Sequence, residues 1–230
     1  MEEEPRGPVI VVPGEVIGTG DNRAGENTVK VQGSIVATRV GIRRGGPEGV
    51  SVIPLKGFYV PRVGDLVVGI VCDVSYNMWK VDINSPYFGV LPATDVFGRR
   101  FDPTMDDPLK EFDIGTVLKA KIVAFDRSQD PLLTIRDQDL GKADFGFLAR
   151  VNPAKIARVI GRGGSMLSKI QQASNSRVIV GQNGTVILTT SDPAMRDKLI
   201  RALKLIEEEA HVYGLTEKVV ELISGKVEGQ

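Results

Sequence analysis

The sequence has little of what metal sites and disulfides need, with one cysteine, Cys72, and one histidine, His211, among 230 residues. A single thiol forms no internal disulfide, and these two residues cannot complete a zinc site, so structural zinc is excluded. No segment approaches the roughly 20 apolar residues of a membrane span. Glu2, Glu3 and Glu4 stand where a secretion signal carries basic residues. We therefore expect a soluble, cytoplasmic protein with no metal, no cofactor and no membrane partner.

Net charge is also absent, because 29 Lys and Arg residues balance 29 Asp and Glu residues. The balance is uneven along the chain. Basic and acidic residues number seven and seven in residues 1–60, nine and thirteen in 61–140, and thirteen and nine in 141–230. The last segment has no carboxylate between Asp144 and Asp192, a stretch that holds Arg150, Lys155, Arg158, Arg162, Lys169 and Arg177. A neutral chain thus carries one basic module, and such modules favour polyanionic partners.

The first two thirds of the chain are rich in β-strand signals, and 42% hydrophobic residues suffice for real cores. Between Val9 and Lys56, short β-branched runs alternate with Gly, Pro and Asn clusters, which predicts a small all-β unit. Residues 61–140 contain five strand-like segments without a helical period: Leu66–Val71, Trp79–Ile83, Gly89–Leu91, Val117–Val123 and Leu132–Ile135. Short strands at this spacing predict a small β-barrel.

The pattern changes after Gly141, where apolar residues recur at helical spacing. Asn152-Pro153 offers a helix cap followed by proline at the first helical position, and Asp192-Pro193 repeats that signal. Asn183-Gly184 lies between two β-branched runs and predicts a hairpin turn. The expected elements are a strand at 145–151, helices at 153–160 and 165–173, strands at 178–180 and 185–188, and a helix at 193–206. This order predicts an α+β domain.

The segment Gly161-Arg162-Gly163-Gly164 joins the two short helices. A loop with so little side-chain bulk lets a phosphate backbone approach closely, and the free N–H groups that open the second helix favour anions. Lys155 and Arg158 extend the charge of Arg162 along the first helix. An isolated Gly-x-x-Gly is more often a simple helix cap, but here the flanking helices, the hairpin and the acid-free stretch favour nucleic acid.

These features resemble known RNA-binding domains. Residues 142–210 resemble a KH domain, with Gly161 to Gly164 as its backbone-binding loop. Residues 61–137 resemble an S-one (S1) domain, the RNA-binding OB barrel of a ribosomal protein, through Val63–Val71, Gly89–Leu91 and Val123–Arg127.

With the β unit that contains Val12-Pro13-Gly14-Glu15, the whole chain resembles the archaeal ribosomal RNA-processing protein four family of exosome cap subunits. The fold class that this resemblance implies is multidomain: an all-β N-terminal domain (1–60), an OB-fold β-barrel of the S1 type (61–140) and an α+β KH domain with C-terminal helices (141–230). The implied partners are single-stranded RNA, a hexameric ring of RNase-PH-like subunits, and further copies of this chain in a trimeric cap.

The resemblance also implies RNA-binding residues. In the KH segment they are Gly161, Arg162, Gly163, Gly164, Lys155, Arg158, Lys169 and Arg177. In the S1 segment, Tyr76 and Trp79 stand where stacking aromatics usually lie, and Arg99, Arg100, Lys119 and Lys121 are candidates for guiding the backbone. Barrel packing is the alternative role of both aromatics, since aromatic rings fill small cores.

Three alternatives compete with a non-catalytic RNA-binding subunit. An enzyme would rest on the carboxylates Asp102, Asp106, Asp107, Glu111 and Asp113, but Pro103 and Pro108 predict a loop there, and no base or nucleophile accompanies them. A transcription elongation and antitermination factor also places S1 before KH, but it has two KH domains and a helical N-terminal domain. Polynucleotide phosphorylase places KH before S1. We expect no catalytic residues and no metal site.

Overall fold

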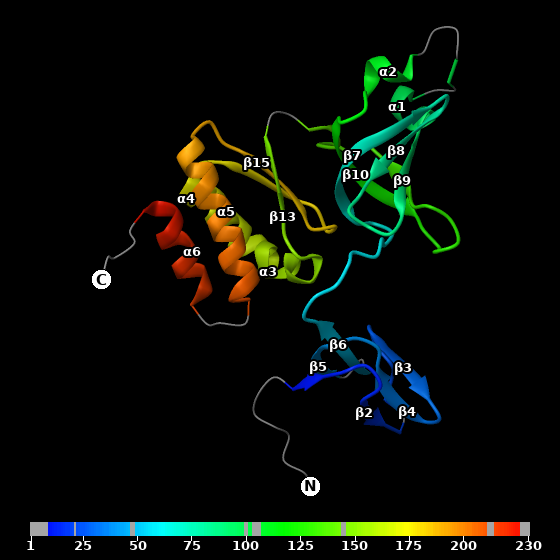
Figure 1. The fold of residues 1–230 in the computed structure, drawn as a ribbon, viewed down its shortest axis with the longest axis vertical. Helices are drawn as coiled ribbons and strands as arrows, with labels where there is room; N and C mark the ends of the chain where they lie inside the picture. The colour runs from blue at the N-terminus through cyan, green and yellow to red at the C-terminus, as the bar shows by residue number, and fades with distance from the viewer. Residues whose placement is uncertain are drawn as a thin grey trace. The chain divides into compact units, whose positions relative to one another are not determined.

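A computed structural model describes residues 9–20, 22–46, 49–98, 101–102, 107–143, 146–210 and 214–225 (Figure 1). The chain divides into two compact units, Met1–Gly57 and Phe58–Gln230. The first unit has one small hydrophobic core, whereas the second has two larger ones, which correspond to a barrel and to an α+β domain.

The described part of the first unit consists of strands and their connections. Its elements are β1 (Ile10–Val11), β2 (Val16–Thr19), β3 (Thr28–Val31), β4 (Ser34–Ala37), β5 (Gly41–Gly46) and β6 (Gly49–Pro54). They form two antiparallel sheets with the orders β1-β5-β6 and β2-β4-β3. Both sheets contribute to one core of Val11, Ile17, Ile35, Ala37, Val50 and Val52. The β-branched runs of the sequence therefore predict this fold correctly.

The second unit begins with the barrel, whose strands are β7 (Leu66–Ser75), β8 (Met78–Asp82), β9 (Phe88–Pro92), β10 (Val117–Ala124), β11 (Leu132–Thr134) and β12 (Gly141–Lys142). The strand order is β11-β9-β8-β7-β10-β12, and a further pairing of β10 with β11 closes five strands into a barrel. Alternate residues point inward, as strand geometry requires. The core includes Trp79, Val81, Leu118, Ala120 and Ile122.

Two short helices, α1 (Ala93–Phe97) and α2 (Pro108–Glu111), lie between strands of the barrel, and α2 begins in the segment where the sequence predicts a loop. At α2, the Asp107 side chain accepts a hydrogen bond of 3.2 Å from the Leu109 N–H, and Pro108 occupies the first turn. Proline suits this position because the first helical N–H needs no partner within the helix. The proline that suggested a loop therefore begins a helix.

The α+β domain has the element order that the sequence predicts. It consists of β13 (Phe147–Arg150), η1 (Pro153–Lys155), α3 (Ile156–Ile160), η2 (Arg162–Gly164), α4 (Ser165–Ser174), β14 (Arg177–Val180), β15 (Thr185–Thr189), α5 (Pro193–Glu208) and α6 (Leu215–Ser224). The antiparallel sheet has the order β13-β15-β14, and α6 packs against α4 and α5 (Figure 1). Among the described residues, no helix is long and apolar enough to cross a membrane.

The turn between β14 and β15, Gly181-Gln182-Asn183-Gly184, docks on the barrel, and we call it the docking turn. The fully buried Asn183 side chain donates to the carbonyls of Val68 (2.7 Å) and Ile83 (2.9 Å) and accepts from the Val68 N–H (3.2 Å). In addition, the Gln182 N–H donates to the Leu66 carbonyl at 2.8 Å. Two domains of the second unit are thus joined through backbone groups of β7 and of the residue that follows β8.

Candidate nucleic-acid interface

The loop Gly161–Gly164, called the KH loop below, is shaped by three glycines with positive φ. Gly161 has φ 75° and ψ 172°, and a Cβ there would lie 2.7 Å from the Met166 nitrogen, which allows no side chain. Gly163 (φ 58°) and Gly164 (φ 80°) also have left-handed backbones, but the space around their Cα atoms is open. A ligand can therefore approach the backbone at the second half of the loop.

The helix α4 begins directly after the KH loop, and Met166 and Ile170 anchor it in the core of the domain. No side chain caps its first turn. The leading N–H groups of a helix have no partner within the helix and attract anions. Together with the exposed guanidinium of Arg162, this end of α4 offers donors and positive charge to a phosphate.

The other predicted cations of the α+β domain differ in their availability. Lys169 on α4 is exposed, and within the described ranges no carboxylate forms an ion pair with it or with Arg162. Arg177, at the start of β14, is exposed but lies 3.7 Å from the Asp139 carboxylate. Lys155, at the end of η1, and Arg158, on α3, are half-buried. Arg162 and Lys169 are therefore the most accessible charges.

The two aromatic residues predicted for the barrel differ in their surroundings, because Tyr76 lies in the turn between β7 and β8 whereas Trp79 lies on β8. Tyr76 is 66% exposed, and its ring lies edge to face with Phe101 at 5.1 Å between centroids. Trp79 is 0% exposed, and its Nε1–H donates to the Phe112 carbonyl at 2.9 Å. The stacking role of Trp79 is therefore wrong, because strand alternation turns its ring into the core. Tyr76 keeps a ring face for a base.

The predicted basic residues of the barrel also need correction. Lys119 points outward from β10 but is only 7% exposed, so it cannot guide an RNA backbone. Its cross-strand partner is Val68, which also points outward and is 1% exposed because the docking turn lies on it. Lys121 is half-buried and pairs with the Asp137 carboxylate at 3.0 Å. Arg99 and Arg100 lie outside the described residues.

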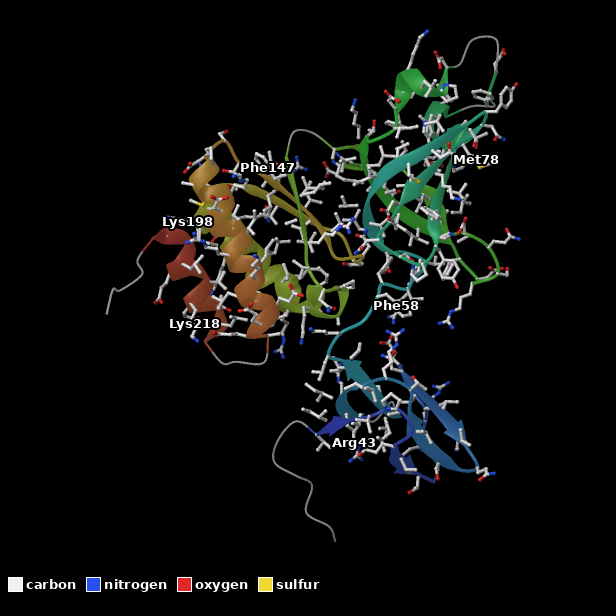
Figure 2. All side chains as sticks on the ribbon, viewed as in Figure 1. Arg43, Phe58, Met78, Phe147, Lys198 and Lys218 are labelled. Carbon is white, nitrogen blue, oxygen red and sulfur yellow. The ribbon has the colours of Figure 1, made fainter. Side chains whose placement is uncertain are left out.

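Three residues on the outer face of β8 and β9 are candidate RNA contacts that the sequence analysis missed. Met78, Lys80 and Phe88 point outward, and both Met78 and Phe88 are exposed. Figure 2 labels Met78 on this part of the barrel. The Lys80 ammonium lies 4.4 Å from the centre of the Phe88 ring. An aromatic ring beside a cation suits a base and its phosphate. The alternation around the inward-facing Trp79 was the signal that could have identified them.

Two of the carboxylates considered for an enzyme, Asp107 and Asp113, serve the local structure. Asp107 caps α2, and the Asp113 side chain accepts from the Ile114 N–H at 2.7 Å, whereas Asp106 lies outside the described residues. In the part of the chain that the structure describes, no three His, Cys, Asp or Glu side chains converge as a metal site. Burial raises the pKa of the Cys72 thiol, which disfavours the reactive thiolate.

One further carboxylate lies in the β10–β11 connection of the barrel. The Asp126 side chain accepts hydrogen bonds from the Ser128 hydroxyl (2.8 Å) and from the Ser128 N–H (2.9 Å). These hydrogen bonds lower the pKa of Asp126, because they favour the ionised form. The carboxylate thus holds the turn and keeps its negative charge.

Family models match the barrel and the α+β domain. Residues 58–97 match the model described as RRP4, S1 domain, and residues 149–208 match the KH domain model. A crystal structure assigned to an exosome complex RNA-binding protein is 38% identical in sequence, with a TM-score of 0.69, and the match covers 74% of this chain and 97% of that one. Both domain resemblances drawn from the sequence are confirmed.

Relatives extend the match to the first unit. The chain is 42% identical to exosome complex component Rrp4 of Nitrosopumilus maritimus over 95% of this chain and 96% of that protein. It is 34% identical to exosome complex component Rrp4 of Pyrococcus furiosus over 95% of this chain and 84% of that protein. With such identities over nearly its whole length, the chain belongs to the exosome complex component Rrp4 family.

Proposed function

We propose that this chain is the RNA-binding cap subunit of an archaeal exosome and that it guides single-stranded RNA into a phosphorolytic ring for 3′-to-5′ degradation. The observation that carries the proposal is the KH loop, whose open glycine backbone lies beside Arg162 and the uncapped start of α4. In this proposal the N-terminal domain (1–60) docks on the ring, the S1 domain (61–140) guides the RNA and the KH domain (141–230) binds it.

The double substitution Arg162→Asp with Gly163→Asp tests this proposal in the full chain. It places negative charge in the KH loop without touching the core residues Ile156, Val159 and Ile170. We expect affinity for single-stranded RNA to fall by about tenfold or more, equivalent to about 1.4 kcal/mol. The stability should fall only by the cost of a side chain at the positive φ of Gly163, about 1 kcal/mol. The measurement is fluorescence anisotropy with labelled RNA.

A matched control is Arg201→Asp with Ser191→Asp, which changes the net charge equally at two exposed positions outside the KH loop. This control should bind RNA as its parent does. Equal binding by the KH-loop variant and its parent would contradict the proposal. Stronger binding of duplex than of single strands would also contradict it, because the KH mode takes single strands.

The proposed subunit is not itself a nuclease. Asp107 and Asp113 accept hydrogen bonds from neighbouring backbone N–H groups, and the S1 and KH domains are binding modules. Purified chain incubated with RNA, phosphate and magnesium should leave the RNA intact. Degradation that disappears on changing Asp106 and Asp107 to Asn would overturn this part of the proposal.

The first unit supports a role in ring docking through the outer faces of its sheets. Ile10, Ile42 and Ile53 form one cross-strand row on the outside of β1-β5-β6, and Ile10 and Ile53 are exposed. Val16, Val36 and Val29 form a second row across β2-β4-β3. Exposed apolar rows on so small a domain suit a protein partner. We propose that three copies of the chain use these faces on a hexameric RNase-PH-like ring.

The substitution Ile10→Asp with Ile53→Asp tests the docking role. Neither side chain belongs to the core, so the domain should stay folded and RNA binding should be retained. We expect loss of co-elution with the ring subunits in size-exclusion chromatography. Undiminished co-elution would show that this face does not dock. The elongation-factor alternative is not favoured, because one KH domain and a β-rich first unit are present here.

A further inference from the structure

The run Arg43-Arg44-Gly45-Gly46 on β5 has no part in the function proposed above. It pairs antiparallel with β6, where Arg44 lies opposite Ser51, Gly45 opposite Val50 and Gly46 opposite Gly49. Both arginines are exposed, and Figure 2 labels Arg43 on the first unit. No atom lies within 4 Å of the position that a Cβ would take at Gly45 or Gly46. The strand thus ends in two arginines and an open stretch of backbone.

A third arginine is held at the same end of the β5–β6 hairpin. The Arg23 carbonyl accepts a hydrogen bond of 3.0 Å from the Val50 N–H, and it occupies the space where a Cβ of Gly49 would lie. Gly49 has φ +124°, a backbone conformation that side chains disfavour. Close packing against a glycine therefore fixes Arg23 beside the hairpin. We call Arg23, Arg43, Arg44, Gly45 and Gly46 the arginine–glycine end.

The charges of these arginines are not neutralised within the described residues. No carboxylate of the described ranges forms an ion pair with Arg23, Arg43 or Arg44. The Glu15 carboxylate accepts from the Val12 N–H instead, at 3.0 Å. Three of the seven acidic residues in 1–60 are Glu2, Glu3 and Glu4, so residues 9–57 contain six basic and four acidic residues. Residues 1–60 are therefore neutral in sum, whereas residues 9–57 have two more basic than acidic residues.

We propose that the arginine–glycine end is a second binding site for the phosphates of single-stranded RNA, on a different unit of the chain from the S1 and KH domains. Guanidinium groups bind phosphate oxygens in a forked geometry, and the open space at Gly45 and Gly46 lets a phosphate come close to the backbone. We favour RNA over an acidic protein surface as the ligand, because the S1 and KH domains of the same chain are RNA-binding modules. This inference rests on the proposed function, in which the chain binds single-stranded RNA.

Two sites on one chain respond differently to the length of the RNA. A short oligonucleotide occupies one site at a time, whereas a long one that reaches both gains from the high effective concentration of the second site. The arginine–glycine end should therefore contribute to the binding of long RNA and contribute little to the binding of short RNA. This length dependence separates a second RNA site from a merely basic surface.

The experiment compares the full chain with the variant Arg43→Gln, Arg44→Gln, using labelled single-stranded RNA of about 8 and about 40 nucleotides. For the long RNA, we expect affinity to fall about tenfold at low salt. The slope of log K against log salt should also become shallower by about 1.4, for two lost phosphate contacts. The short RNA should bind almost unchanged. The control Lys30→Gln, Lys56→Gln removes the same charge from the same unit and should have little effect.

Glu48 follows Gly46 and Pro47 in the sequence. The substitution Glu48→Gln should change the RNA affinity in the direction opposite to the arginine variant. Removing that negative charge should raise the affinity for long RNA. The proposal is overturned if the arginine variant binds long RNA with unchanged affinity and slope, or if it loses only co-elution with the ring. An equal loss for both RNA lengths would overturn it as well. The KH-loop variant tests the proposed function separately, because it should weaken the binding of short RNA.

Discussion

The KH domain contains two Gly-x-x-Gly turns of the same spacing with opposite surroundings. In the KH loop, Gly163 and Gly164 face open space and Arg162 is exposed. In the docking turn, Asn183 is completely buried, and the Val151 carbonyl and Pro153 crowd the position that a Cβ of Gly184 would take. The first turn keeps its backbone available, whereas the second uses its polar groups to hold the barrel.

The difference shows what a glycine spacing does and does not specify. It specifies a tight backbone path with positive φ, which both turns have. Whether the exposed N–H and C=O groups then meet a ligand or another domain depends on the neighbouring surface. For the docking turn, that surface is the unpaired backbone near Val68 and Ile83. Substitutions in the two turns should therefore separate RNA binding from stability.

The largest effect should come from Asn183→Ala. It leaves the carbonyls of Val68 and Ile83 and the Val68 N–H buried without their partner. We expect the free energy of unfolding to fall by about 3 kcal/mol, since each buried unsatisfied group costs about 1–3 kcal/mol. Urea denaturation followed by tryptophan fluorescence, with Trp79 in the barrel, measures it. Gln182→Ala in the same turn is the control, and similar stabilities of both variants would contradict the docking role.

A pair of alanine substitutions compares the glycines directly. Gly184→Ala must move the Val151 carbonyl and should cost about 2–3 kcal/mol of stability. Gly163→Ala meets no neighbouring atom, so only its positive φ opposes the new side chain, at about 1 kcal/mol. Thermal unfolding of both variants gives the difference. Equal losses would mean that backbone strain alone, and not the crowding of the docking turn, sets the cost.

Tyr76→Ala extends the comparison to the barrel, where Tyr76 is exposed and Trp79 is buried. If a base stacks on the Tyr76 ring, RNA affinity should fall by about 1–3 kcal/mol, the usual value for a stacked base. Stability should change little. Tyr76→Phe keeps the ring and is the control. Loss of stability without loss of affinity would instead assign Tyr76 to the packing of Phe101.

The smallest effect concerns the salt dependence of RNA binding. Each phosphate contact contributes about −0.7 to the slope of log K against log salt for single strands. Arg162→Gln should make this slope shallower by about 0.7. Gln182→Ala should leave it unchanged, because the docking turn carries no charge for RNA. A slope that does not respond to Arg162→Gln would remove that side chain from the phosphate contacts.

The sequence by itself determined the domain types and most element positions. Alternation of β-branched residues, the Asn183-Gly184 pair and the caps at Asn152 and Asp192 are local signals, and the structure has the expected strands, turn and helices there. Local signals suffice in these cases because neighbouring residues alone set backbone preferences and the inward or outward direction of side chains. The KH loop was identifiable for the same reason.

Only the tertiary structure decided which outward-facing residues remain accessible. Lys119 points away from the barrel core, as its place on β10 allows, yet it is buried beside Val68, which the docking turn covers. For Trp79 the resemblance implies stacking and leaves barrel packing as the alternative, and its alternation with Met78 and Lys80 corresponds to packing in the core. A strand pattern distinguishes two faces of a sheet, but the covering of an outward face depends on residues more than 100 positions away, such as Asn183.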